Sequence, residues 1–415
     1  MTGDTWVQVV ERLETSVDQM VRFQSELVAC PALGPDNGGR GEAEKAALVE
    51  AWLKKMNPDQ ILHVDAPDHR VPGGRRPNLI ALFQGRGQGR VWVLSHLDVV
   101  PDGGRSLWDS DPFVLRRDGD RIHGRGVEDN HQAIVTSLFA VQALRDAGLK
   151  PAADVGLIFV SDEETGSAYG LAHVLGERPD LFTPADLIIV PDTGQPDGAM
   201  VEIAEKSILW LKFTVTGRQC HASRPHLGLN TLRASARMIC ALDEALPRAF
   251  GERNDLFLVP ASTFEPTKKE ANVANVNTIP GEDVFYFDSR LLPNYDLARV
   301  KAEFERVVRE TAAASAVTVK IEPVQELQAP PATPADAPVV RALVKAIAAV
   351  HGREAHPRGV GGGTVAAFFR KKSLPAAVWS TLAGTAHMPN EFALLSNHLA
   401  DAKIMAYVYL RLDQG

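Results

Sequence analysis

The chain has 415 residues, of which 45% are apolar and 23% are charged, and its formal net charge is −8. This is the composition of a globular protein with enough length for two or three domains and an ample core. The negative charge argues against a nucleic-acid partner and against an anionic membrane surface, and no apolar run approaches the about 18–20 residues of a membrane span.

The N-terminal segment and the cysteines give expectations about the cellular compartment of the protein. Residues 1–20 are amphipathic with interspersed acids and lack the basic start and apolar centre of a signal peptide, so we expect a cytoplasmic protein. Cys30, Cys220 and Cys240 are odd in number and form no C-x-x-C pair, which predicts neither a disulfide framework nor a thiolate zinc site. We expect them to be small buried residues.

The first half of the chain alternates between two periodicities. Apolar residues recur at helical spacing in some segments and form short β-rich or buried runs in others. The expected helices are 5–29, 41–56, 132–148 and 167–177, and the expected strands are 78–84, 90–98, 155–161 and 186–191. This order predicts an α/β fold with a mainly parallel sheet and helices on both faces.

From about residue 207 the pattern changes to half-buried strands and helices, enough for a separate small α+β domain. Its expected strands are 207–217, 282–291 and 316–322, and its expected helices are 230–248 and 296–315. A proline-rich return linker at 323–338 precedes helices at 338–351, 363–371 and 391–411 and a short strand at 375–380. The simplest organisation is one discontinuous domain, 1–206 and 325–415, with an insert at 207–324.

Two adjacent carboxylates follow one of the buried strands. Glu163 and Glu164 come directly after the run 155–160 and a short polar step. Neighbouring carboxylates repel each other unless a cation lies beside them. A metal ion would relieve the repulsion, with one carboxylate as its ligand and the other handling a proton. On its own, however, such a pair is more often a solvated turn.

Other predicted strand ends and turns carry side chains of the same kind. These additional candidates are His96, Asp98, Asp129 and Asp192. Because the carboxyl ends of parallel strands meet in one crevice of an open α/β sheet, all of these groups could share a site. A two-metal hydrolase needs a bridging carboxylate, terminal nitrogen and oxygen ligands and an acid–base carboxylate, and this set offers candidates for each role.

Five motifs together carry a resemblance to a known family. They are His-Leu-Asp at 96–98, Gly-Arg-Gly-x-x-Asp at 124–129, Asp-Glu-Glu-Thr-Gly at 162–166, Pro-Asp at 191–192 and Ala-His-Met-Pro-Asn-Glu at 386–391. In order and spacing, over nearly the whole length, the chain resembles the dinuclear-zinc metallohydrolases and metallopeptidases that include acetylornithine deacetylase, succinyl-diaminopimelate desuccinylase, aminoacylase and carboxypeptidase G. The resemblance implies a zinc-peptidase-like catalytic domain at 1–206 and 325–415 and a lid or dimerisation domain at 207–324.

The resemblance also implies a set of metal ligands. His96 and Asp192 would bind one divalent ion, Glu164 and His387 would bind the other, and Asp129 would bridge the two. Histidine and carboxylate ligands without a thiolate fit Zn²⁺, with Co²⁺ and Mn²⁺ as alternatives.

Three further residues are implied to serve the reaction. Asp98 would orient the His96 imidazole and raise its basicity, and Glu163 would be the general base. His221, in the segment 217–225, resembles a lid-domain histidine that polarises the scissile carbonyl or holds the oxyanion, often from the partner subunit of a homodimer. The alternative is that His221 is an ordinary surface histidine.

Substrate-binding positions are implied as well. Asn277 and Arg290 resemble such positions, and Arg290 would clamp a substrate carboxylate, although it could instead pair with Asp288. Residues 361–364 open a predicted helix, so the backbone of Gly362, Gly363 and Thr364 could receive an anion or form a tight active-site loop.

The expected function is metal-dependent hydrolysis of the amide C–N bond of an N-acyl amino acid or small peptide, by a metal-activated water with Glu163 as general base. Two departures from the family pattern are expected to touch the substrate pocket, Asn130-His131-Gln132 after Asp129 and Val365-Ala366 after Thr364. They leave open an alternative, hydrolysis of a non-peptide C–N bond such as a carbamoyl or aryl-amine group. A non-catalytic metal-binding protein is a further alternative, disfavoured because every proposed ligand is present.

Overall fold

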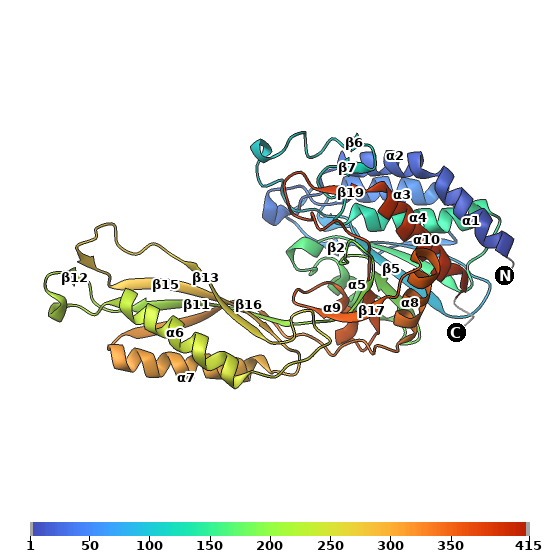
Figure 1. Ribbon diagram of the computed structural model, residues 1–415. Coiled ribbons are helices and arrows are strands. Elements are labelled where there is room, and N and C mark those ends of the chain that lie inside the picture. The colour runs from blue at the N-terminus through green and yellow to red at the C-terminus, as the bar shows by residue number, and fades with distance from the viewer. Residues whose placement is uncertain (1–2, 412–415) are drawn as a thin grey trace. The chain divides into compact units, whose positions relative to one another are not determined.

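A computed structural model describes residues 3–411, which form two compact units (Figure 1). The smaller unit comprises residues 204–332 and 358–363, and the other described residues form the larger unit. The smaller unit therefore contains a second, short piece of chain that the expected insert at 207–324 did not include.

The larger unit is built on one eight-stranded sheet with helices on both faces, as expected for the α/β class (Figure 1). The strand order is β1-β4-β8-β5-β9-β18-β10-β17. The four central strands are parallel: β8 (Asp154–Val160), β5 (Arg90–His96), β9 (Leu187–Val190) and β18 (Ala376–Val378). Beside them, β4 (Leu79–Phe83) and β10 (Met200–Glu205) run antiparallel to the central strands. The strand β1 (Gln60–His63) pairs antiparallel with β4, and β17 spans His356–Val360.

Both faces of this sheet are buried, because its central strands are almost wholly apolar. On one face Trp92 and Leu94 pack with side chains of α5 (Leu171–Glu177) and α9 (Ala366–Lys371). Successive side chains of a strand alternate between faces, so Val91 and Val93 point to the opposite side. The remaining helices of this unit are α1 (Gly3–Thr15), α2 (Val17–Val28), α3 (Ala43–Lys55), α4 (His131–Asp146), α8 (Pro338–His351) and α10 (Leu395–Arg411).

A small three-stranded sheet joins two distant parts of the larger unit. The strand β19 (Phe392–Leu394) pairs antiparallel with β7 (Arg121–His123), which pairs with β6 (Arg116–Asp118). This pairing places the segment before β19, which contains His387, beside the loop between β7 and α4, which contains Asp129. Another short ribbon joins β2 (Ala66–Pro67) and β3 (Arg75–Arg76).

The smaller unit has a four-stranded antiparallel sheet in the order β13-β15-β11-β16. Buried residues alternate with more exposed ones along its central strands, so one face of the sheet is apolar. The phenylalanines on that face include Phe213 and Phe285, whose stacked rings have centroids 4.7 Å apart. Helices α6 and α7 pack on this core, and the side chains of Asn230 and Asp296 cap their N-termini. The bounds are β11 (Ser207–Thr216), α6 (Thr231–Ala249), β13 (Thr263–Lys269), β15 (Glu282–Leu291), α7 (Leu297–Ser315) and β16 (Thr318–Leu327), with a separate ribbon of β12 (Cys220–His221) and β14 (Thr278–Ile279).

Several expected elements differ from those observed. The helix expected at 5–29 is divided into α1 and α2, and Ser16 accepts the N–H groups of Gln19 and Met20 at the break. The proposed linker at 323–338 begins as strand, because β16 continues to Leu327. Cys240 is exposed and Cys30 and Cys220 are half-buried, so the expectation that all three are buried is wrong. Over residues 3–411, no helix has the length and apolarity needed to cross a membrane.

Candidate metal centre

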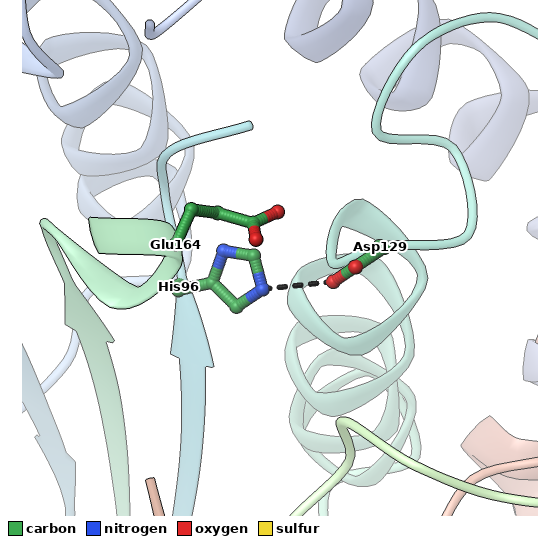
Figure 2. A group of neighbouring side chains, drawn as sticks. All are labelled: His96, Asp129 and Glu164. Carbon is green, nitrogen blue, oxygen red and sulfur yellow. Dashed lines mark hydrogen bonds and ion pairs between the residues drawn. The ribbon is translucent and has the colours of Figure 1, made fainter. Parts of the chain in front are cut away.

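Three side chains from separate elements converge in the larger unit (Figure 2). His96 ends the central strand β5, Glu164 lies in the 3-10 turn 163–165 that follows β8, and Asp129 lies in the loop that leads into α4. One ligand atom from each of the three lies within 4.8 Å of the others. The sheet thus brings together, at the carboxyl ends of parallel strands, residues that are widely spaced in sequence.

Asp129 presents its two oxygens to different histidines. Its Oδ1 lies 2.9 Å from Nε2 of His96, and its Oδ2 lies 3.0 Å from Nε2 of His387. Each histidine has a second carboxylate beside it, because Asp192 Oδ1 is 3.4 Å from His96 Nε2 and Glu164 Oε2 is 3.1 Å from His387 Nε2. The five residues therefore form two halves that share Asp129: a His96 half with Asp192, and a His387 half with Glu164.

The electrostatics of both halves favour a cation. Burial alone would lower the pKa of His96, but the carboxylates of Asp129, Asp192 and Asp98 outweigh it and raise that pKa well above its usual value. Hydrogen bonds to Asp129 and Glu164 raise the pKa of His387 to about 10. The same negative potential that retains a proton on each imidazole would attract a divalent cation in its place.

The donor set fits a pair of divalent ions. Each half offers one imidazole nitrogen and carboxylate oxygens, ligands that suit Zn²⁺, Mn²⁺ and Co²⁺. Burial raises the pKa of Glu164, while its hydrogen bond to His387 opposes that rise. Burial also opposes ionisation of Asp129, yet its contacts with His387 and His96 lower its pKa overall. Carboxylates this close together repel one another, and a positive partner between them would stabilise their ionised forms.

Asp98 contacts the site differently from the expectation. The Nδ1 atom of His96 lies 3.0 Å from the backbone carbonyl of Asp98 and 3.6 Å from its carboxylate, so the carbonyl makes the closer contact. The Asp98 carboxylate instead accepts the backbone N–H groups of Glu163 at 3.1 Å and Glu164 at 3.0 Å. Asp98 therefore orients the histidine through its backbone and fixes the Glu163–Glu164 turn through its side chain.

Glu163 is half-buried beside the same cluster. Burial, followed by repulsion from Asp192, raises the pKa of its carboxyl group well above the ordinary value. A carboxyl group with a raised pKa holds a proton more readily, which is the property needed in a group that accepts and returns protons.

The smaller unit places His221 beside Asn277. His221 in β12 pairs with Thr278 in β14, and the Ala222 N–H donates to the Asn277 carbonyl over 2.8 Å. Both side chains are exposed. The backbone N–H of Ser223 donates to Nδ1 of His221 over 3.2 Å, and the Ser223 hydroxyl lies 2.8 Å from the same nitrogen. Nδ1 can accept both bonds when the imidazole proton is on Nε2.

Arg290 adopts the paired state that was the alternative to substrate binding. Its Nε and Nη2 donate to the two carboxylate oxygens of Asp288 over 2.7 and 3.0 Å. Its Nη1 donates to the Gly361 carbonyl over 3.1 Å. Gly362 and Gly363 are exposed, and Thr364 Oγ1 accepts the N–H of Ala366 over 3.2 Å at the start of α9. A substrate role for this group remains a prediction.

The two departures from the family pattern are buried. Asn130, His131 and Gln132 are each at most 2% exposed and are hydrogen-bonded to protein groups. Val365 and Ala366 are equally buried, in the core beneath α9. The expectation that these residues touch the substrate pocket is therefore wrong. It was the observation that motivated the alternative of a non-peptide substrate, which now has no support from these positions.

Sequence reasoning missed three residues that hold the site. Asn130 bonds to both residues of the His96 half, while Glu128 and Glu391 bond to backbone groups near Asp129 and His387. Two of them were visible as acids inside recognised motifs, at 124–129 and 386–391, where no role was given to them.

Comparisons with known proteins found relatives along most of this chain. A family model described as peptidase family M20/M25/M40 matches residues 92–411. An uncharacterized metallohydrolase of Methanococcus maripaludis is 35% identical over 421 residues, with 96% of this chain and 99% of the relative covered. A succinyl-diaminopimelate desuccinylase of Gluconobacter oxydans is 28% identical over 403 residues, covering 95% of this chain and 97% of the relative.

The fold is also that of a solved structure. Human carnosine dipeptidase 1 superimposes with a TM-score of 0.75 at 18% identity, and the match covers 99% of both chains. At that identity the likeness supports the fold alone. The family match and the identity with the Methanococcus maripaludis metallohydrolase support more, and they show that this chain is a metallohydrolase belonging to peptidase family M20/M25/M40.

Proposed function

We propose that the protein is a dinuclear metal-dependent amidohydrolase that cleaves the amide C–N bond of an N-acyl amino acid or a small peptide. The observation that carries the proposal is the position of Asp129, whose two oxygens face two separate pairs of one histidine and one carboxylate. A shared carboxylate between two such pairs is the arrangement that a two-ion hydrolase needs. The name of one relative, a succinyl-diaminopimelate desuccinylase, supports an amide substrate.

The residues would divide the binding of the ions between them. His96 and Asp192 would hold one ion, Glu164 and His387 the other, and Asp129 would contact both. When bound, divalent ions polarise a carbonyl group and make hydroxide available near neutral pH. We propose Zn²⁺ as the native metal, since the ligands are imidazole and carboxylate, with Co²⁺ and Mn²⁺ able to replace it.

Glu163 would be the acid–base group. Its carboxylate would accept a proton from the attacking water and later return that proton to the departing amine nitrogen. Two features support the assignment: Asp98 fixes the backbone N–H of Glu163 over 3.1 Å, and burial raises the pKa of the Glu163 carboxyl group. Asp98 would act only as a positioning residue.

His221 would hold the substrate carbonyl oxygen by donating from Nε2. The bond from the Ser223 N–H to Nδ1 supports this assignment, because it leaves the proton on Nε2. In line with the family resemblance, we propose a homodimer in which His221 serves the partner subunit's metal centre. Asn277, Arg290 and residues 362–364 are the proposed substrate contacts.

The decisive experiment replaces Glu163. Metal-loaded Glu163→Ala protein is assayed on N-acetyl amino acids, N-succinyl amino acids and dipeptides, with metal content measured by elemental analysis. We expect kcat to fall about 10²–10⁴-fold with both ions retained, as for loss of a general base. Glu177→Ala, at an exposed position on α5, is the control and is expected to behave as wild type. Undiminished turnover by Glu163→Ala would exclude the proposed base.

A further inference from the structure

Glu128 is a buried carboxylate that binds the backbone of a distant loop. It is 2% exposed and precedes Asp129 directly. Its Oε1 accepts the N–H groups of Ala383 and Gly384, and its Oε2 accepts the N–H groups of Thr385 and Ala386 and the Thr385 hydroxyl. These donors lie 255 to 258 positions along the chain and end one residue before His387.

Glu391 makes the opposite connection. It lies four residues after His387, is fully buried, and accepts the backbone N–H groups of Gly126 at 3.0 Å, Glu128 at 3.0 Å and Asp129 at 3.2 Å. Arg125 Nη1 donates to the same carboxylate over 2.6 Å and supplies a positive partner. Each of the two loops therefore binds the main chain of the other through one carboxylate.

The reciprocal bonds of Glu128 and Glu391 support the His387 half of the centre more than the His96 half. His96 ends β5 and Asp192 follows β9, two neighbouring parallel strands of the large sheet, and Asn130 joins them by side-chain bonds. His387 lies in a loop and has a left-handed φ of 64°, which few L residues adopt without support from their surroundings. The bonds from Glu128 to residues 383–386 provide that support.

We propose that Glu128 and Glu391 are positioning residues that fix the His387 loop against Asp129, and that Glu128 serves the His387 half alone. The inference rests on the proposed two-ion centre. Glu391 binds the Asp129 N–H directly, so its loss would disturb the shared ligand and both halves. The hydrogen bonds of the Glu128 carboxylate go to residues 383–386, before His387, so its loss would spare the His96 half.

The test measures metal binding instead of turnover. Metal-free wild type, Glu128→Gln and Glu128→Asp are titrated with Co²⁺, and both the number of bound ions and the visible absorption of each are recorded. Glutamine keeps one acceptor oxygen but turns an NH₂ group toward donors that point at Glu128. Aspartate keeps the charge, so it provides a conservative rescue and a second variant if Glu128→Gln does not fold.

A matched control separates positioning from simple stability. Asp186, 8% exposed, accepts bonds from Trp92 Nε1 and from the N–H and hydroxyl of Thr183. It precedes β9 whereas Asp192 follows it, so the length of this four-residue strand, about 13 Å, separates the two. Asp186→Asn is expected to lose stability as Glu128→Gln does, and to bind both ions as wild type does.

We expect wild type to bind two ions and Glu128→Gln to bind one normally and the other about 10–100-fold more weakly, with Glu128→Asp in between. Adding Asp192→Asn to Glu128→Gln is expected to abolish the remaining tight site, whereas adding Glu164→Gln is expected to leave it. Wild-type affinity for both ions in Glu128→Gln, or equal weakening of both, would overturn the inference. Failure of wild type itself to bind two ions would instead overturn the proposed function.

Discussion

The side-chain amide of Asn130 donates to Oδ1 of Asp192 across 3.0 Å. The amide oxygen of the same residue accepts the backbone N–H of His96 at 3.3 Å, and Nδ2 also donates to the Pro191 carbonyl at 2.9 Å. One buried side chain thus joins the ends of two parallel strands and touches both residues of the His96 half. Asn130 would therefore position the ligands of the His96 half, as we propose that Glu128 positions His387 in the other half.

Asn130→Ala is therefore expected to lower the affinity for the ion that we propose His96 and Asp192 bind. Outer contacts that orient ligands typically contribute about 10–100-fold to metal affinity, and we expect a loss in that range. The measurement is a Co²⁺ titration of metal-free protein. Asn397→Ala is the control, since the Asn397 amide donates to the Thr381 carbonyl instead. Unchanged affinity at both sites in Asn130→Ala would show that strand geometry alone positions these ligands.

The homodimer and the role of His221 can be tested by mixing two inactive proteins. His221→Ala and Glu163→Ala are each expected to lose most activity, by removal of the oxyanion donor and of the general base. If His221 serves the partner subunit, a mixed dimer contains one site with both groups intact, and activity is expected to return after subunit exchange. No recovery in mixed dimers verified by mass would indicate that His221 acts within its own chain or has no catalytic role.

Gly156 in β8 is expected to tolerate no side chain, because it lies opposite Trp92 in the register of β5 and β8. A Cβ atom there would lie 2.1 Å from Cζ3 of the buried Trp92 ring. We expect Gly156→Ala to lower the free energy of unfolding by about 1–3 kcal/mol, as measured by urea denaturation. Gly176→Ala on α5 meets open space and is expected to be neutral or to stabilise by up to about 1 kcal/mol.

Acid is expected to destabilise the protein through His398. Its Nδ1 donates to the Leu394 carbonyl at 3.0 Å, its Nε2 lies 3.3 Å from Nε2 of Gln24, and burial lowers its pKa to about 4. As pH falls from about 6.5 to about 4, the unfolded chain binds a proton that native His398 does not. The free energy of unfolding therefore falls in this window, by up to about 3 kcal/mol at roughly 1.4 kcal/mol per pH unit.

His398→Gln is expected to reduce this slope, which can be measured by urea denaturation at several pH values between 4 and 7. His356→Gln, at an exposed histidine, is the control and is expected to leave the slope unchanged. Parallel curves for wild type and His398→Gln would show that other groups cause the acid sensitivity.

The sequence contained enough to predict the α/β class and to nominate the side chains that meet. The central strands are largely apolar, β5 ends in His96, and β9 is followed by Asp192, so the rule for parallel strands leads from these two residues to a common edge. The antiparallel strand β10 was not predicted, because Met200–Glu205 has no period that distinguishes it from a loop. Strand direction depends on partners elsewhere in the chain, such as Val378 opposite Glu202.

The supporting contacts could not be predicted for a related reason. The partners of Glu128 and Glu391 are backbone N–H groups, which every residue except proline carries, and they lie more than 250 residues away. Asn130 was visible as a departure from the family pattern, but only its burial shows that it braces Asp192 and does not face a substrate.

The crossed bonds between the loops of Asp129 and His387 have a consequence for biosynthesis. The ribosome makes His96, Asp129 and Asp192 long before it reaches His387 and Glu391. A nascent chain can therefore hold the proposed ligands of one ion while those of the other are still incomplete. Catalytic competence would come only with the last part of the polypeptide, after the large sheet has its central strands, which would keep partly made chains from hydrolysing amides.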